Sequence, residues 1–304
     1  MLRISTVLSI LLAVTPLVAS PADQATTQPK LSAAQIVDKN VQARGGLQAW
    51  RAVQTISFSG TLGAGGNQRA SLVNPNPNQE GPNKQIGSQR PKEEVTLPFV
   101  MELKRPRKMR FELQFNGQTA IQVYDGVHGW KLRPFLNRME VEPYTPEEMK
   151  TASRQADIDG PLVDYAAKGT RVELVGIEKV EGHDTYKLKL SLKNGQSIHV
   201  WIDAQTFLET KIEGQPRELD GKEHAVEVCF RDYHPVGGLQ IPFVLETKVL
   251  PLAKPSPGYR DVPVPPERII IQKVEINPKI LDSHFSKPDV SAMSSGKPSE
   301  GHKG

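Results

Sequence analysis

Apolar and polar residues alternate with a period of two in about twelve short segments of this chain. The segments 109–115 and 186–192 show the pattern throughout, and the segment 226–231 shows it except at Cys229. Because successive side chains of a strand point to opposite faces, each segment has one apolar and one polar face. The strands of a parallel sheet covered on both faces would be apolar throughout. The pattern therefore predicts a large antiparallel sheet with one apolar face.

Turn signals separate these segments at intervals of roughly 8–12 residues. Asn116-Gly117 and Asp125-Gly126 are strong hairpin signals. They join strands that we expect at 107–115, 119–124 and 129–133. Further strands are expected at 54–62, 94–103, 171–180, 186–192, 197–202, 208–213, 225–233, 239–248 and 268–276. Consecutive strands joined by short turns favour a meander, and a meander that curls forms a barrel or half-barrel.

Helix signals are few. Ser32 and Gln35 have capping-box spacing before a helix expected at 32–44, and Thr145-Pro146 begins a second helix expected at 145–158. A shorter helical candidate lies at 162–167. Two helices are too few to cover ten or more strands, but they can close the mouth of a curled sheet. The fold class expected is mainly β with a few helices: a curled antiparallel sheet forming a half-open β-barrel with a helical lid.

The first residues resemble an export signal, with Arg3 followed by a short apolar stretch and then small residues. Cleavage fits after Ala19 or after Ala22, and an uncleaved anchor is the alternative, although the stretch is shorter than the ~20 residues of a membrane span. We expect export to the periplasm. The expected organisation is a signal peptide at 1–22, a flexible leader at 23–31, one domain at 32–285 with an insertion at 63–92, and a disordered tail at 286–304. The insertion is rich in Gly, Asn and Pro and fits either a disordered loop or a functional flap.

The charge balance argues against nucleic-acid binding. The chain has 304 residues with 38 basic and 34 acidic side chains, a net charge of +4, and removal of residues 1–22 lowers this to about +3. Its single cysteine, Cys229, excludes an internal disulfide, so the core must hold the fold by itself. A monomer is expected.

Signals of catalysis are weak. The seven His residues show no metal-binding spacing, and there is no Gly-x-Ser-x-Gly turn or phosphate-binding glycine loop. Asp157 and Asp159 faintly resemble part of a calcium loop but fit the end of a helix better. We therefore expect no catalytic residue, metal or cofactor.

The apolar positions of the strands are the candidate ligand-binding residues, since an apolar cavity under a curled sheet suits acyl chains. They are Met109, Phe111, Leu113, Phe115, Trp130, Leu188, Leu190, Leu192, Ile198, Val200, Val226, Val228 and Phe230. The same positions also fit an ordinary packed core. Alternation places Trp201 on the opposite face from Val200 and Ile202.

A basic cluster precedes one of these strands. Arg105, Arg107 and Arg110, together with two lysines, are candidates for contact with a lipid headgroup or with acidic residues of a partner. A solvated strand edge is the alternative, because lysines are common there.

Several motifs resemble the bacterial outer-membrane lipoprotein-sorting family (LolA/LolB-like). They are Ala43-Arg44-Gly45-Gly46-Leu47-Gln48-Ala49-Trp50, Ile56-Ser57-Phe58-Ser59-Gly60, the run from Lys104 to Arg110, Tyr124-Asp125-Gly126-Val127-His128-Gly129-Trp130, and Phe207-Leu208-Glu209-Thr210-Lys211. The resemblance covers most of 32–248 and implies a half-open antiparallel barrel with helices as a lid over an apolar cavity. It also implies binding of lipoprotein acyl chains, with related proteins sensing misassembled envelope components. The insertion at 63–92, the proline-rich segment at 251–266 and the tail depart from that pattern.

Two hypotheses follow. The first is a non-catalytic periplasmic carrier that holds lipid or lipoprotein acyl chains in an apolar cavity. The second is an envelope sensor or scaffold that binds a protein partner.

Overall fold

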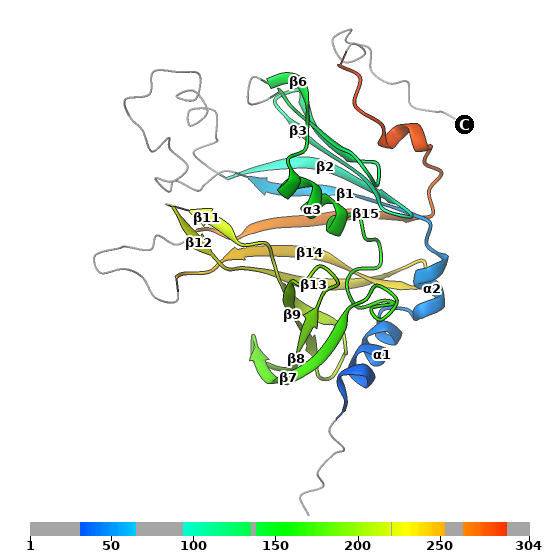
Figure 1. Ribbon diagram of the computed structural model, residues 1–304, viewed down its shortest axis with the longest axis vertical. Helices are drawn as coiled ribbons and strands as arrows, with labels where there is room; N and C mark the ends of the chain where they lie inside the picture. Colours follow the sequence, from blue (N-terminus) through cyan, green and yellow to red (C-terminus); the bar gives the residue numbers. More distant parts are fainter. Residues whose placement is uncertain (1–30, 65–93, 135–137, 220, 253–263, 291–304) are drawn as a thin grey trace, which may run out of the picture. The chain divides into compact units, whose positions relative to one another are not determined.

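A single large antiparallel sheet dominates the computed structural model (Figure 1). The structure describes residues 31–64, 94–134, 138–219, 221–252 and 264–290. Within these ranges, thirteen strands pair in the order β6-β5-β4-β3-β2-β1-β15-β14-β13-β10-β9-β8-β7, and β11 and β12 form a separate two-stranded sheet. The prediction of a mainly β protein with a large antiparallel sheet and few helices is confirmed.

The first strands of the large sheet are β1 (Thr55–Ala64), β2 (Val95–Lys104), β3 (Lys108–Phe115), β4 (Gln118–Tyr124), β5 (Gly129–Arg133) and β6 (Arg138–Pro143). The later strands are β7 (Arg171–Val180), β8 (His183–Ser191), β9 (Ser197–Asp203), β10 (Glu209–Glu213), β13 (Val226–Val236), β14 (Leu239–Val249) and β15 (Glu267–Ile276). The small sheet consists of β11 (Arg217–Leu219) and β12 (Lys222–His224).

Three described α-helices accompany the sheet: α1 (Ala33–Ala43), α2 (Leu47–Ala52) and α3 (Pro146–Gln155). Ser32 caps α1 with the reciprocal side-chain hydrogen bonds of a capping box, as predicted. Thr145 is the N-cap of α3, as predicted, and also forms a capping box with Glu148. A 3₁₀-helix, η4 (Asp282–Phe285), follows β15. None of the described helices is long and apolar enough to cross a membrane.

The chain crosses the whole sheet between β6 and β7. These two strands are consecutive among the strands of the large sheet, yet they occupy its opposite edges. The large sheet of the described residues therefore has two edges. Strands β6 and β7 are not hydrogen-bonded to each other, so the sheet is not closed into a barrel. The connection between them contains α3 and the segment 156–170, and it must pass over one face of the sheet.

Four features of the fold differ from the sequence predictions. Strand β6, helix α2 and the β11–β12 hairpin are additional elements, and residues 162–167 form turns instead of a helix. The helix is prevented because Gly160 and Asp164 both have positive φ angles, 72° and 52°, on either side of Pro161.

Several predictions lie outside the described residues. They include the signal peptide, the leader up to residue 30, the insertion from residue 65 onward and the tail from residue 291. The described residues from Ser32 onward belong to one unit by their contacts.

Candidate functional site

The strand register gathers the predicted apolar side chains on one face of the sheet, here called the apolar face. Residues directly opposite each other on paired strands point to the same face. In the half of the sheet that contains β1 to β3, Phe111 lies opposite Met101, Met101 opposite Phe58, and Phe58 opposite Val274. In the half that contains β8 to β14, the pairs on the same face are Leu245–Phe230, Val228–Ile212, Ile212–Val200 and Val200–Leu188.

A bulge in β1 and β15 joins these two series. The register shifts by one residue between Ser59 and Gly60, so that Gly60 lies opposite Ile271 and Leu62 opposite Ile269. Because Ile269 in turn lies opposite Leu245, the apolar face continues without a break from β3 to β8. Of the predicted candidates, all but Trp130 belong to strands whose register places them on this face, with Leu192 one residue beyond the end of β8.

Side chains of the apolar face differ in their exposure to solvent. Near α2, Ile56, Leu103 and Met109 are buried. Farther along the same strands, Phe58, Phe111 and Leu113 are only partly buried. Val228 and Phe230 on β13 are also partly buried, whereas Leu188, Leu190 and Val200 are completely covered. The apolar face is therefore packed near α2 and over β8 and β9, and elsewhere it combines buried side chains, such as Phe99 and Ile271, with partly exposed ones.

A hollow of about 640 Å³ lies at the end of β2 and β3 opposite to Arg105. Its lining includes Leu97, Pro98 and Phe115, together with polar residues of the β3–β4 turn. A volume of this size is within the range of small-ligand sites. Of the predicted candidates, Phe115 is the one that lines it.

Helix α3 lies over the apolar face at the β4–β5 side. Lys131 on β5 is almost buried, and its Nζ lies 2.6 and 2.7 Å from the two carboxylate oxygens of Glu148 on α3. Lys131 is on the apolar face because it lies opposite Gln122, which lies opposite Phe111. Burial raises the pKa of Glu148, but hydrogen bonds from Lys131 and Thr145 outweigh this and hold that pKa below its usual value. This ion pair between the buried Lys131 and the partly exposed Glu148, which the sequence analysis missed, fixes α3 to the sheet.

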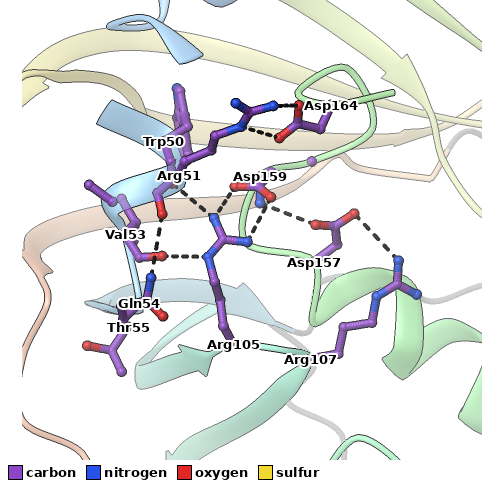
Figure 2. Close-up of polar contacts among 12 residues, drawn as sticks. Trp50, Arg51, Val53, Gln54, Thr55, Arg105, Arg107, Asp157, Asp159 and Asp164 are labelled. Atoms are coloured by element: carbon purple, nitrogen blue, oxygen red, sulfur yellow. Dashed lines mark hydrogen bonds and ion pairs between the residues drawn. The ribbon is translucent and has the colours of Figure 1, made fainter. Parts of the chain in front are cut away.

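Arg105 forms the centre of a second polar cluster, the Arg105 cluster, shown in Figure 2. Its Nε donates to the carbonyl oxygen of Val53 at 2.6 Å, and its terminal nitrogens donate to the carbonyl of Trp50 and to both carboxylate oxygens of Asp159. The two carbonyls belong to the C-terminal end of α2, where such groups lack partners within the helix. Asp159 lies in the 156–170 segment, and the hydrogen bonds that Arg105 donates to its carboxylate raise the pKa of Arg105. One guanidinium thus ties together α2, the β2–β3 turn and the 156–170 segment.

Further ion pairs strengthen the same junction. Arg51 on α2 donates to both carboxylate oxygens of Asp164, at 2.9 and 2.6 Å, and these hydrogen bonds lower the pKa of Asp164. Lys168 lies 2.8 Å from Asp157. Arg44 at the end of α1 donates to the carbonyl of Asp159 at 3.2 Å. The 156–170 segment is therefore held to both N-terminal helices by side-chain contacts.

Trp130 is on the opposite face, here called the mixed face. It lies opposite Val123, which lies opposite Arg110, so its side chain is turned away from Phe111. There it packs against the buried cluster of Ile121, Val123, Leu132 and Phe285. The register does not bring Trp130 together with the other candidate lining residues.

The three arginines of the predicted headgroup cluster are also separated. Arg105 is engaged in the cluster described above, whereas Arg110 is on the mixed face, 2.6 Å from Glu112 and hydrogen-bonded to the carbonyl of His284. Arg107 is half-exposed and lies 4.0 Å from Asp157. Only Arg107 of the three extends substantially into solvent.

The mixed face also contains Trp201 and Cys229, as the alternation predicted. Trp201 lies opposite Lys187 and Lys211, whose ammonium groups lie 5.0 and 4.1 Å from the centre of its ring. Its indole nitrogen donates to Glu178 at 2.8 Å. Cys229 is buried, and burial raises the pKa of its thiol, which opposes thiolate chemistry.

No group of three or more His, Cys, Asp or Glu side chains suited to a metal ion occurs among the residues that the structure describes. Asp157 and Asp159, considered above as part of a calcium loop, are instead paired with Lys168 and Arg105.

Comparison with known proteins gives structural similarities at low sequence identity. No family model matches the chain, and no curated protein matches it. A LolA superfamily protein from Nitrosomonas europaea is similar over 85% of this chain and 99% of its own, with 12% identity and a TM-score of 0.49. A DUF1329 family protein from Desulfovibrio piger has the same identity and TM-score over 84% of this chain and 97% of its own. A putative outer membrane lipoprotein-sorting protein domain from Vibrio parahaemolyticus also has 12% identity and a TM-score of 0.49, over 84% of this chain and 96% of its own. Members of the family that the sequence motifs resemble are thus among the solved structures to which this chain is similar.

Proposed function

We propose that this chain is an exported, non-catalytic carrier that holds the acyl chains of a lipid or of a lipidated protein against the apolar face. The observation that supports this most strongly is the set of partly exposed apolar side chains on that face, including Phe58, Phe111, Leu113, Val228 and Phe230. An apolar surface of several strands that its own helices leave accessible is expected to bind an apolar ligand.

In this proposal the sheet acts as a half-open barrel, and the connection from β6 to β7 acts as its lid. Helix α3 is fixed over the apolar face by Lys131 and Glu148, and the 156–170 segment is fixed by Arg105 and Arg51. Entry of a long chain between this connection and the sheet would require the connection to move, which would break the Arg105 cluster. Loading would then depend on the strength of these ion pairs.

The free energies of burial and association favour long or multiple acyl chains as the ligand. Each buried methylene contributes about 0.8 kcal/mol, so ten of them contribute about 8 kcal/mol. Association costs roughly 4–15 kcal/mol, which a short single chain does not offset. We therefore expect short fatty acids to bind weakly and diacyl compounds to bind firmly.

Uptake of a fluorescent fatty-acid analogue by the delipidated mature protein tests the proposal. The double substitution Phe111→Ser with Leu113→Ser removes two accessible side chains of the apolar face and should weaken uptake at least tenfold. The matched control is Val244→Ser with Ile270→Ser, a partly exposed apolar pair directly opposite each other on the mixed face. Equal uptake by the folded test and control variants would contradict the assignment of the site.

A further inference from the structure

Two of the apolar side chains that the structure leaves in solvent are near the same end of the sheet. Among the large hydrophobic residues of the described ranges, Val127 is 69% exposed and Leu281 is 66% exposed, the two highest values. Val127 lies in the β4–β5 turn, and Leu281 directly precedes η4. In an antiparallel sheet the β2–β3 and β4–β5 turns occur at the same end, so Val127 is near residues 105–107.

Contacts of their neighbours, Gly126 and Asp282, relate Val127 and Leu281 to the two sides of the β2–β3 turn. A Cβ atom on Gly126 would lie 3.7 Å from the carbonyl oxygen of Arg107. Asp282, the neighbour of Leu281, lies 2.8 Å from the Nζ of Lys104 and 3.2 Å from that of Lys108. We call this region, formed by Lys104, Arg107, Lys108, Val127 and Leu281, the turn-end surface.

Positive charge is in excess around Val127 and Leu281, the two apolar tips of the turn-end surface. Lys104, Arg107 and Lys108 belong to the surface itself, and Lys279 is exposed two residues before Leu281. The carboxylates nearby are Asp282, Asp125 and Asp157, the last of which lies 4.0 Å from Arg107. Four cations against three carboxylates leave an excess of one positive charge.

Hydrogen bonds hold both tips in their exposed positions. A carboxylate oxygen of Asp125 accepts from the backbone N–H of Val127 at 2.7 Å, and the hydroxyl of Tyr124 donates to the carbonyl of Gly126, also at 2.7 Å. The Nζ of Lys104 donates to the carbonyl of Ile280 at 2.7 Å. The tips are therefore presented by ordered turns and not by free chain.

We propose that the turn-end surface docks on an anionic lipid bilayer. Val127 and Leu281 enter the interface between headgroups and acyl chains, and the surrounding lysines and Arg107 meet the negative headgroups. Exposed apolar residues surrounded by cations form the combination that binds peripheral proteins to such surfaces. Docking in this orientation places the Arg105 cluster close to the membrane. This inference goes beyond the carrier proposal and does not depend on it.

Flotation of the full mature protein with lipid vesicles tests the docking. We expect binding to vesicles of phosphatidylcholine mixed with phosphatidylglycerol, weaker binding to phosphatidylcholine alone, and a decrease in binding as salt screens the cations. The double substitution Val127→Glu with Leu281→Glu should weaken binding to the mixed vesicles at least tenfold. Lys108→Gln with Lys279→Gln should reduce binding to the mixed vesicles and leave binding to phosphatidylcholine unchanged.

The matched control replaces equally exposed apolar residues elsewhere. Val175 and Ile177 on the edge strand β7 are 55% and 59% exposed, so Val175→Glu with Ile177→Glu adds the same charge away from the turn-end surface. This control should bind the mixed vesicles like the wild type. Failure of the wild type to bind either kind of vesicle would overturn the proposal, as would wild-type binding by Val127→Glu with Leu281→Glu.

Uptake of the fatty-acid analogue by the same variants separates the two proposals. The glutamate variant of the turn-end surface should load normally, whereas Phe111→Ser with Leu113→Ser should still bind vesicles. A variant that loses only vesicle binding therefore tests the docking proposal for the turn-end surface. A variant that loses only uptake tests the carrier proposal for the apolar face.

Discussion

Glu246 on β14 is a carboxylate whose protonation depends on the folded structure. Its side chain is 8% exposed and lies 2.9 Å from Arg268 and 3.0 Å from Lys248, with Arg231 at 3.6 Å. Hydrogen bonds from Arg268 and Lys248 lower its pKa to about 2. The folded protein therefore binds a proton at this carboxylate less readily than the unfolded chain does.

A depressed carboxylate pKa stabilises the fold above the unfolded pKa, and this contribution is lost as the pH falls toward the folded value. Glu246→Gln should lower the free energy of unfolding by about 1–2 kcal/mol at pH 7, with allowance for the solvent exposure of Arg268. The difference from the wild type should shrink as the pH falls from about 4.5 to about 2. Urea unfolding across this range measures it, with the exposed Glu275→Gln as the control. A difference that does not change with pH would show that Glu246 acts through packing alone.

Gly45 has a backbone conformation that other residues rarely adopt. Its φ angle is +114°, and an added Cβ would overlap the carbonyl oxygen of Gly238 and lie 3.0 Å from the Cα of Leu239. This close approach joins the α1–α2 turn to the β13–β14 turn, where the N–H of Gln240 also donates to the carbonyl of Arg44.

Gly45→Ala should therefore destabilise the protein by about 2–4 kcal/mol, since it adds both backbone strain and overlap. Gly176→Ala is the matched control, because no atom lies within 4 Å of the position its Cβ would take. The control should change the stability by no more than about 0.5 kcal/mol. Thermal or denaturant unfolding of both variants checks the pair, and equal stabilities would contradict the account of this turn.

Single residues also show where reasoning from sequence succeeds and where it fails. Alternation within one strand correctly assigned Trp201 to the face opposite Val200. Trp130 was grouped with Phe111 although they belong to different strands, and their relative faces depend on the register across β3, β4 and β5. That register places Val123 opposite both Arg110 and Trp130. Alternation within a strand does not determine this relationship between strands.

At the scale of elements, strong local signals predicted position and type well. The capping boxes at Ser32 and Thr145 mark the starts of α1 and α3, and the Asn116-Gly117 turn joins β3 to β4 as expected. The elements that were missed are short: α2 has six residues, β6 has six, and β11 and β12 have three each. Segments of this length contain too few periods for a pattern to be distinguished from a loop.

The Arg105 cluster provides the prediction at this scale. Asp159→Asn leaves the guanidinium of Arg105 without its anionic partner at a largely buried site, which should cost about 2–4 kcal/mol of local stability. Amide hydrogen exchange in the 156–170 segment should then become faster, and uptake of the fatty-acid analogue should accelerate because the segment opens more often.

Asp184→Asn is the control, because it removes an ion pair with Lys179 in which both side chains are exposed. It should leave exchange and uptake unchanged. Unchanged exchange in Asp159→Asn would show that the 156–170 segment is held by its buried apolar residues, Leu162 and Val163, instead of by the ion pairs.

At the scale of the whole molecule, the expected meander proved to be two runs of strands joined by β15. Sequence reasoning expected neighbours along the chain to pair, and they do so from β1 to β6 and over most of the second half. The last strand returns to pair with β1, bringing Ile276 opposite Ile56. No local pattern predicts contact between residues so distant in the chain. No local pattern predicts the pairs Arg105–Asp159 and Lys131–Glu148 either. They form because the β6–β7 connection crosses the sheet.

Native mass spectrometry of the mature protein tests the central claim most directly. The full precursor is expressed in a bacterium that exports it, and the protein is purified without detergent. The account predicts a stoichiometric adduct with the mass of a diacyl lipid, which solvent extraction removes and which is lost from Phe111→Ser with Leu113→Ser. The pair Val244→Ser with Ile270→Ser should retain the adduct. A bare polypeptide mass, with no uptake of added phospholipid or fatty acid, would contradict the account and indicate a filled core with a protein-binding role.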